Sequence, residues 1–397
     1  MKIDKRKPSH WLYLSASAFN VLAAILIRPL LKLRKAPSPP PPTILLYGHK
    51  LNGNLLALYN AFCTRHPEMD VRFLTLDPLY QRELRSRGTR STLLTAPAAS
   101  LHLARAHAII SDHGLHTLQP LLALTDIRFF DVWHGIPFKG FDADDFRTQH
   151  RYDEVWVASP LHRELYTDRF GFDSKRVVAT GYPRTDRLLQ PESTPPEIRE
   201  RLGLPVTGPL ILFAPTWAQD DAGRAIYPFG HDEETFLEAL TNVATHHNAT
   251  ILLRPHLNTR SRATAQHPHI RCLPSDKHPD TEEILLVSDV LICDWSSIAF
   301  DYLLLSRPTI FLDVPAPFRK GFSLGPEYRF GPIVHDLERL TQTLEEALAT
   351  PDRYWRAHRE QHTSTQHAVY RRHRDGKAAD RCIERLQTYL AMSESSR

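Results

Sequence analysis

The stretch SDVLICDWSSIAFDYLLLSRPTIFL, residues 288–312, decides the fold class. It begins with a short apolar run from Val290 to Cys293, continues through two serines into a helical pattern, and ends in a second apolar run from Thr309 to Leu312. Short apolar runs are typical of buried parallel strands, and a helix between two of them forms a β–α–β unit. We therefore expect parallel sheet with helices on both faces.

Apolar runs of the same kind occur on both sides of this stretch. In the amino-terminal half they are Thr43 to Tyr47, Val71 to Leu76, His107 to Ser111 and Ile127 to Trp133, and in the other half Leu210 to Ala214 and Thr250 to Arg254 precede the two already quoted. Residues 190–209, QPESTPPEIRERLGLPVTGP, separate the two sets and are interpreted as a connection carrying one short helix. The pattern predicts an α/β protein in which two Rossmann-like domains face each other across a cleft.

These patterns divide the chain into four parts. Residues 1–42 form an amino-terminal segment, residues 43–190 the first Rossmann-like domain and residues 209–355 the second. Residues 356–397 include the run AADRCIERLQTYLAM, in which apolar residues lie three and four apart. This spacing predicts closing helices at the carboxyl end.

The amino-terminal segment carries a mostly apolar run from Trp11 to Ile27. A helix needs about 20 apolar residues to cross a bilayer, so this run is marginal as a span. Basic residues flank the run on both sides, which suits an anionic membrane surface, and the proline-rich residues 36–42 follow as a stiff spacer. Three interpretations stay open: an interfacial helix, a signal-anchor and a cleaved signal peptide.

Composition and missing motifs narrow the function. The chain has 397 residues and a net charge of only +4, which gives no reason to expect nucleic acid as a partner. Its four cysteines are scattered without a CxxC pair, which argues against a zinc site or a disulfide framework. P-loop, GxGxxG and HExxH motifs do not occur. Carboxylate pairs such as Asp144 and Asp145 lie in polar loops, so we expect no metal site and no cofactor.

Polar residues at strand ends are the candidates for chemistry, because open α/β sheets bind ligands at the carboxyl ends of their strands. In WHGIPFK, residues 133–139, an apolar strand ends in His134. The imidazole of His134 suits a general base that takes a hydroxyl proton near neutral pH. A simpler role as a turn cap stays open.

Three strand ends in the second half suit a phosphorylated ligand. Arg254 and His256 follow the strand TILLR and could neutralise a diphosphate, although Arg254 could equally pair with a carboxylate. Ser296 and Ser297 stand where a strand passes into a helix, so hydroxyls, backbone N–H groups and the helix dipole would all favour phosphate oxygens. Thr216, in the segment APTW, could contact the same ligand or cap a turn.

Two turn-rich segments near the end of the first half are less specific. They are ASP at residues 158–160 and TGYPRTD at residues 180–186. Their glycine and prolines indicate tight turns, so we favour a structural role. Ser159 and Arg184 are the candidates there for contacts in the cleft.

Taken in order, these segments resemble the CDP-glycerol:poly(glycerophosphate) glycerophosphotransferase family, whose members prime and polymerise teichoic-acid-like chains. The resemblance extends over residues 131–334 and rests on WHGIPFK, TGYPRTD, FAPTW, RPH and the stretch quoted first. Several motifs in one order are more specific than any one of them. The chain departs from the family pattern in three places: Ile136 replaces a threonine, CDW at residues 293–295 replaces TDY, and residues 318–322 match only loosely. These departures leave the reaction type in place but make the polyol of the donor a separate question.

The resemblance implies a GT-B-like fold that holds the acceptor in the first domain and a CDP-linked donor in the second. It implies His134 as catalytic base, with Lys139 of the same motif on the acceptor side. It implies His256 as a second catalytic residue at the donor phosphates, beside the paired serines that bind the diphosphate. Glu282 or Glu283 would lie near the donor nucleoside, and no metal is implied.

We therefore predict a transferase that moves a polyol phosphate, most simply glycerol phosphate, from a CDP-activated donor to a hydroxyl of a lipid-linked glycan or polyol-phosphate acceptor. It would release CMP in the synthesis of a cell-surface polymer such as teichoic acid or capsule. We expect a peripheral or single-anchored protein at the cell membrane with its catalytic domains facing the cytoplasm. Two alternatives stay open: a GT-B glycosyltransferase that uses a nucleotide sugar, and a non-catalytic membrane-attached glycan-binding protein. The sequence does not indicate the oligomeric state.

Overall fold

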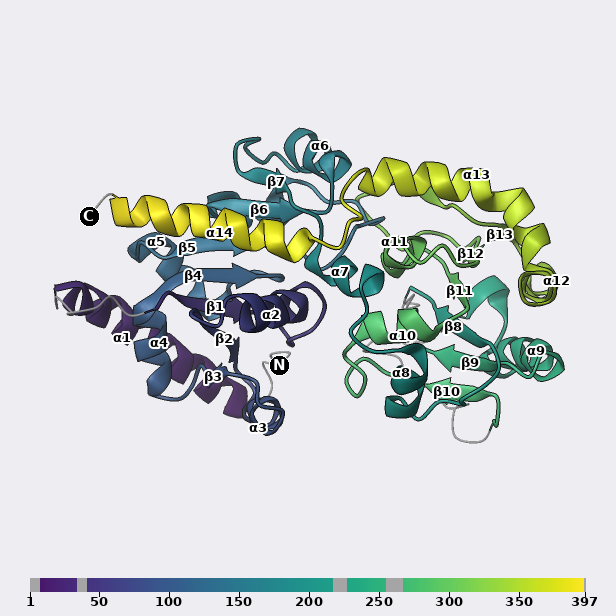
Figure 1. The fold of residues 1–397 in the computed structure, drawn as a ribbon, viewed down its shortest axis with the longest axis horizontal. Helices are drawn as coiled ribbons and strands as arrows, with labels where there is room; N and C mark the ends of the chain where they lie inside the picture. Colours follow the sequence, from purple (N-terminus) through teal and green to yellow (C-terminus); the bar gives the residue numbers. More distant parts are fainter. Residues whose placement is uncertain (1–7, 34–40, 217–226, 255–266, 396–397) are drawn as a thin grey trace. The chain divides into compact units, whose positions relative to one another are not determined.

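The computed structural model describes residues 8–33, 41–216, 227–254 and 267–395. The chain forms two compact units. The first unit contains residues 1–134, 142–184 and 376–397, and the second contains residues 135–141 and 185–375. Each unit is built on one parallel sheet (Figure 1).

The sheet of the first unit has seven strands in the order β3-β2-β1-β4-β5-β6-β7. The strands are β1 (Thr43–Tyr47), β2 (Asp70–Thr75), β3 (Ser91–Leu93), β4 (Ala106–Ser111), β5 (Arg128–Asp131), β6 (Glu154–Val157) and β7 (Val177–Ala179). The helices are α1 (Pro8–Leu33), α2 (Gly53–Arg65), α3 (Pro78–Ser86), α4 (Ala98–Arg105), α5 (Gln119–Leu124), α6 (Pro160–Asp168) and α14 (Ala378–Ser395). All four strands predicted for this half are present, and β3, β6 and β7 are additional.

Alternate residues of β1 supply the two halves of the core in this unit. All five β1 side chains are buried, as expected for a central parallel strand. Ile44 and Leu46 belong to one apolar cluster, which includes side chains of α2 and α14. Leu45 and Tyr47 belong to a second cluster, which includes side chains of α1 and α4. The sheet is therefore covered by helices on both faces, as predicted.

Helix α1 packs on the first unit through one face and exposes the other. On the buried face, Asn20 Nδ2 donates to the carbonyl oxygens of Leu94 and Ala96 at 2.8 and 3.0 Å. Arg28 Nε donates to Asp126 Oδ1 at 2.6 Å, and Arg28 Nη1 reaches two backbone carbonyls of the α4–β4 junction. The large side chains of the opposite face are each more than half exposed: Trp11, Leu12, Phe19, Leu22, Leu26, Leu30 and Leu33.

The sheet of the second unit has six strands in the order β10-β9-β8-β11-β12-β13. The strands are β8 (Leu210–Ala214), β9 (Thr250–Leu253), β10 (Ile270–Cys272), β11 (Val290–Cys293), β12 (Thr309–Leu312) and β13 (Ile333–Val334). The helices are α7 (Pro183–Leu189), which begins in the first unit, α8 (Pro195–Arg201), α9 (Glu233–His246), α10 (Thr281–Val287), α11 (Ile298–Leu303), α12 (Leu337–Ala349) and α13 (Pro351–Tyr370). The short helix expected within residues 190–209 is α8.

The motif that follows His134 is part of the second unit. There Gly140 N donates to Gly321 O at 2.7 Å, and Ser323 N donates to Phe138 O at 2.8 Å. A Cβ atom on Gly140 would lie 2.3 Å from the carbonyl oxygen of Lys320, so only glycine allows this approach of the two backbones. The glycine of the motif is thus explained by close packing.

Candidate active site

The two sheets share one topological feature that locates ligands. In the first unit the strand order reverses direction at β1 and β4, and in the second at β8 and β11. Residues that follow these strands line the crevice in which doubly wound sheets bind ligands. In the first unit these residues are His49, after β1, and Asp112 and His113, after β4, with His134 after the neighbouring strand β5.

His134 is held in one tautomer by the backbone. Its Nδ1 lies 3.0 Å from the carbonyl oxygen of Asp112. Because a carbonyl oxygen only accepts hydrogen bonds, Nδ1 must carry the proton, and Nε2 keeps its lone pair. His134 is exposed to solvent. The geometry therefore fits the predicted general base.

His113 lies flat against His134. The two ring centroids are 4.2 Å apart and the ring planes differ by 10°. His113 Nδ1 is 2.7 Å from Oδ1 of Asp112, whose side chain is only 5% exposed. Burial of His113 opposes its positive charge, but the carboxylates of Asp112 and Asp131 outweigh that effect and raise its pKa. His113 is thus the imidazole of the pair that favours the charged form.

The pKa of His134 moves in the opposite direction. Although water reaches this side chain, protein atoms crowd the ring, and this loss of hydration lowers the pKa of His134. The positive charge of His113 lowers it further. Among the smaller effects, the Asp112 carbonyl and carboxylate act to raise the pKa and Arg184 acts to lower it. His134 is therefore neutral, and ready to accept a proton, at pH values where an ordinary histidine is partly charged.

Asn54 and Arg184 fix the backbone that carries His134. Asn54 Nδ2 donates to the carbonyl oxygens of Val132 and Trp133 at 2.8 and 2.6 Å. The Asn54 side-chain oxygen accepts from Arg184 N at 3.0 Å, and Arg184 Nη1 donates to His134 O at 2.7 Å. Arg184 is 8% exposed. The Arg184 side chain therefore contacts His134 at the main-chain carbonyl of His134.

Ser159 and Lys139, two other residues predicted on the acceptor side, have local roles. Ser159 is fully buried, and its Oγ accepts from His162 N at 3.4 Å as the N-cap of α6. Lys139 is exposed, and its ammonium group lies 5.2 Å from the centre of the Phe141 ring in the second unit. Its carbonyl oxygen accepts from Ser323 Oγ at 2.7 Å.

In the second unit, Asp294 organises the point where the strand order reverses. Its Oδ1 accepts from the backbone N–H groups of Thr216 and Trp295, each at 2.6 Å. Burial raises the pKa of Asp294 to about 6, although these hydrogen bonds act to lower it. Asp294 thus ties the end of β8 to the end of β11 and fixes the position of Thr216.

The paired serines lie where the sequence places them, at the start of α11. Ser296 and Ser297 are half-buried, and Ser297 is the N-cap residue. The Ser297 hydroxyl makes no capping hydrogen bond. Its oxygen is therefore not used to satisfy the helix end.

Arg254 and Glu282 take part in packing within the second unit. Arg254 donates from Nη1 to the carbonyl oxygens of Leu273 and His278, each at 3.0 Å, and from Nη2 to Thr281 Oγ1 at 2.8 Å. Glu282 is 3% exposed and lies 3.7 Å from Arg187. His256, the second predicted catalytic residue, lies outside the described residues.

Comparison with known proteins supplies the family. A model of the CDP-glycerol:poly(glycerophosphate) glycerophosphotransferase family matches residues 43–388, which is most of the chain. The chain belongs to this family. The resemblance inferred from the motifs is thereby confirmed.

Relatives in the glycerophosphotransferase family differ in the polyol they use. The teichoic acid glycerol-phosphate transferase of Staphylococcus aureus is 29% identical over 254 residues, which cover 57% of this chain and 64% of the relative. The teichoic acid poly(ribitol-phosphate) polymerase of Bacillus spizizenii is 26% identical over 355 residues, which cover 85% of this chain and 54% of the relative. The chain thus spans less than two thirds of either relative.

Solved structures show the same fold. The wall teichoic acid polymerase TagF matches with a TM-score of 0.72 and 19% identity, covering 96% of this chain and 98% of that one. A UDP-N-acetylglucosamine 2-epimerase from Listeria monocytogenes matches with a TM-score of 0.56 and 13% identity, covering 89% and 97%. The predicted GT-B-like fold of this glycerophosphotransferase family member is confirmed.

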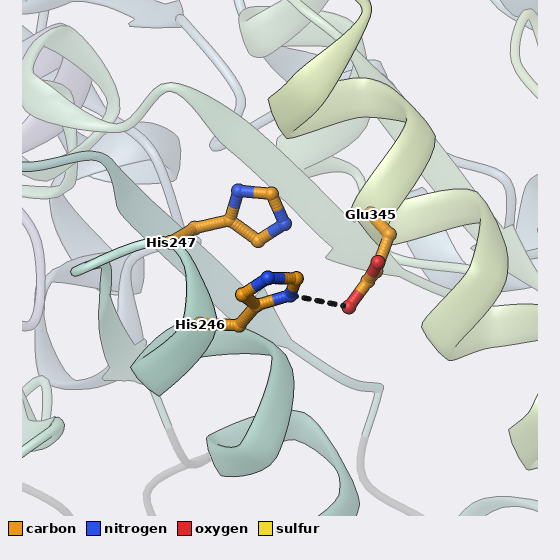
Figure 2. Close-up of side chains that lie close together, drawn as sticks. All are labelled: His246, His247 and Glu345. Carbon is orange, nitrogen blue, oxygen red and sulfur yellow. Dashed lines mark hydrogen bonds and ion pairs between the residues drawn. The ribbon is translucent and has the colours of Figure 1, made fainter.

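Among the residues that the structure describes, one group could hold a metal ion. Its members are His246 at the end of α9, His247 after it and Glu345 of α12, and their ligand atoms all lie within 4.8 Å of one another. Figure 2 shows the three side chains. His246 Nδ1 lies 3.4 Å from Glu345 Oε1. These histidines precede β9, so they lie at the amino end of the strands, opposite the edge that carries Thr216 and Ser296. The group is therefore separate from the residues proposed for this family's transfer reaction.

Proposed function

We propose that this protein transfers a polyol phosphate, with glycerol phosphate as the first choice, from a CDP-activated donor to a hydroxyl of a membrane-linked acceptor. The acceptor is a glycan or a polyol-phosphate chain, and the product CMP is released. Family membership supports the reaction type. The observation that carries the proposal is His134, whose Nδ1 is bonded to the Asp112 carbonyl so that Nε2 keeps a lone pair at a solvent-accessible strand end.

In the proposed step, Nε2 of His134 removes the proton of the acceptor hydroxyl while the oxygen attacks the β-phosphorus of the donor. A new phosphorus–oxygen bond forms, and the bond between this phosphorus and the oxygen bridging to CMP breaks. The electron pair of the broken bond goes to the CMP phosphate. Loss of hydration, together with the charge of His113 held by Asp112, lowers the pKa of His134 and keeps it neutral before the step.

We assign donor binding to the second unit. Ser296 and Ser297 would contact the diphosphate through hydroxyl and backbone N–H groups, and His256 would stabilise the departing phosphate. Thr216 lies at the adjoining strand end and would complete the contact. Arg254 and Glu282 would shape this region from within, because both are engaged in the packing around α10.

We also propose that α1 lies in the plane of the membrane rather than across it. The helix is long and apolar enough to span a bilayer by length and composition. However, Asn20 and Arg28 are bonded to the first unit, and a crossing helix would have to give up those bonds. The exposed apolar face would enter the lipid, and the basic residues on both sides of α1 in the sequence favour an anionic, cytoplasm-facing surface.

The test is CMP release by the purified full chain with CDP-glycerol or CDP-ribitol and a lipid-linked disaccharide acceptor. Release that requires the acceptor supports the proposal and identifies the donor. We expect His134→Ala to lower turnover by roughly 10²–10⁴-fold, the usual effect of losing a general base. Near-normal turnover of this variant would remove His134 from the mechanism. Release of UDP from a UDP-sugar instead of CMP would favour a glycosyltransferase.

A further inference from the structure

Three more histidines surround the proposed base at the same edge of the first sheet. They are His49, which follows β1, and His113 and His116, which follow β4. The proposed reaction uses only His113 of the three, and only to keep His134 neutral. Four imidazoles gathered where the strand order reverses require an explanation, because this crevice is where doubly wound sheets bind ligands.

The rings form a continuous series. The centroid of His113 is 4.2 Å from that of His134 and 4.7 Å from that of His49. The centroid of His49 is in turn 5.9 Å from that of His116. His49, His116 and His134 are solvent-exposed, and His113 is half-buried. The series is therefore open to a ligand along its length. We call residues 49, 113 and 116 the histidine track.

Among the described residues, each histidine of the track has a ring nitrogen that makes no hydrogen bond. His113 uses Nδ1 to bind Asp112, and His116 Nδ1 lies 3.2 Å from the Tyr47 hydroxyl. Within the described part of the chain, the ring of His49 makes ring contacts but no hydrogen bond. His116 also has a φ of 47°, a left-handed conformation that is strained in a non-glycine residue and often marks a functional site.

Electrostatics favour an anion over a metal as the missing ligand. Partial burial lowers the pKa of His49 to about 4 and also lowers that of His116, and the charge of His113 adds to both effects. A nearby anion would favour the charged form of each imidazole and raise its pKa. A metal ion requires ligand atoms gathered closely around it. Among the described residues, the ring nitrogens of the track do not form such a group.

A surface hollow continues the track toward α1. This hollow of about 490 Å³ is lined by His116, Thr117, Arg151 and Ala18 of α1, with residues of α5. Arg151 adds a permanent positive charge, and its guanidinium suits phosphate oxygens. The hollow and the track share His116, so together they lead from the helix that we place at the membrane to His134.

We propose that the histidine track and Arg151 bind the phosphodiester groups of the acceptor chain and guide its end from α1 to His134. This inference rests on the proposed function, because it names the acceptor as a polyol-phosphate chain. Imidazole N–H groups would donate to successive phosphate oxygens, and the uncharged polyol segments would pass between the rings. The donor also carries phosphate, so the experiment must separate the two ligands.

The binding test uses a short fluorescent oligomer of poly(glycerol phosphate) and the full chain carrying His134→Ala, so that no turnover occurs. Fluorescence anisotropy gives the dissociation constant. Adding His49→Ala and His116→Ala should weaken binding by about tenfold or more, because hydrogen bonds to charged groups are lost. A neutral polyglycerol of the same length should not bind to the track, and CDP-glycerol should not displace the labelled oligomer.

Matched variants keep the test specific. His66→Ala removes a histidine of the same unit that pairs with Glu68, and should leave binding unchanged. His116→Arg supplies a hydrogen-bond donor at the same place in the hollow and should retain most of the affinity. Thermal unfolding of the double variant checks that its fold is intact, as expected for two exposed side chains.

The outcomes separate this inference from the proposed function. Failure of the His134→Ala chain to bind the oligomer, equal binding by the double variant, or displacement of the oligomer by CDP-glycerol would each overturn the track. If the protein releases no CMP from any CDP-polyol but its oligomer binding depends on the track, the track is supported and the transferase proposal is wrong. In an active enzyme, the double variant should raise the acceptor KM about tenfold and leave the donor KM unchanged.

Discussion

At the scale of single residues, Asp112 links the two stacked histidines of the candidate active site, His113 and His134. Its carbonyl oxygen fixes the tautomer of His134, and its carboxylate holds His113 against the same ring. One buried residue thus sets both the position of His134, the proposed base, and the charge beside it. The pair behaves as a unit, so removal of either contact should change the proton affinity of His134.

Replacing His113 by glutamine should move the pH dependence of turnover. The substitution removes a positive charge next to His134 and frees the Asp112 carboxylate, and both changes raise the pKa of His134 toward its ordinary value of 6.5. A base must be deprotonated to act, so the acidic limb of the kcat profile should shift to higher pH, with activity lost first below neutrality. Arg184 and Asp131 remain in place in this variant.

The measurement is kcat at saturating donor and acceptor between about pH 5 and pH 8, the range in which a histidine titrates. His66→Gln is the control, because this histidine lies on the surface with Glu68. An acidic limb that stays in place or moves to lower pH would contradict the proposed role of His113.

The sequence pointed to His134 because an apolar strand runs directly into a His-Gly pair. It gave no reason to select His49 or His113, although both also follow strands. Their importance depends on β1 and β4 being neighbours, and that strand order is a long-range property. Arg254 is the opposite case, because the sequence selected it as a ligand-binding candidate and the structure shows it bonded within the protein. Its partners Leu273 and His278 lie in a loop whose path the sequence does not specify.

At the scale of elements, α1 combines a bonded face and an apolar face. Replacing Leu22 and Leu26 by serine should reduce binding to anionic lipid vesicles by at least about tenfold, because each buried leucine contributes about 1.5–3 kcal/mol. Both side chains are more than half exposed in the protein, so the melting temperature should change little. Vesicle sedimentation and thermal unfolding measure the two effects.

Val206→Ser is a suitable control for that experiment, because Val206 is 80% exposed in the second unit. Unchanged vesicle binding by the double leucine variant would rule out the exposed face of α1 as the lipid contact. A large drop in its melting temperature would show instead that the leucines stabilise the fold.

The longer strands were predictable, and several short ones were not. Runs such as TILLY and LILFA are mostly apolar and do not alternate with polar residues, so burial on both faces is visible in the sequence. β7 and β13 have three and two residues, and β6 begins with Glu154, which is fully buried against Arg385. An acidic residue in a sequence indicates a surface position unless its ion-pair partner is known. The partner of Glu154 is Arg385, 231 residues away.

At the scale of the whole molecule, the chain enters the first unit more than once. Its last segment, α14, packs there with α2, and Leu386 of α14 is fully buried in the same cluster as β1 (Figure 1). The stability of the first unit therefore depends on α14, which is far from β1 in the sequence. The second unit is complete without them.

Replacing Leu386 by alanine should destabilise the first unit by about 2–5 kcal/mol, the usual cost of a large cavity in a core. Hydrogen exchange followed by mass spectrometry should show faster exchange in β1 and unchanged exchange in β8. Met392→Ala on the same helix is the control, since Met392 is 61% exposed. Equal loss of protection in both sheets would mean that the two units unfold together.

The attachment of α1 to the first unit also has a geometric consequence for the polymer. Asn20 and Arg28 fix the helix to the same body that carries His134. If α1 lies in the plane of the membrane as proposed, His134 is held at a constant height above the bilayer. The proposed transferase would then extend only the acceptor chains whose ends reach this height, and shorter chains would not be extended.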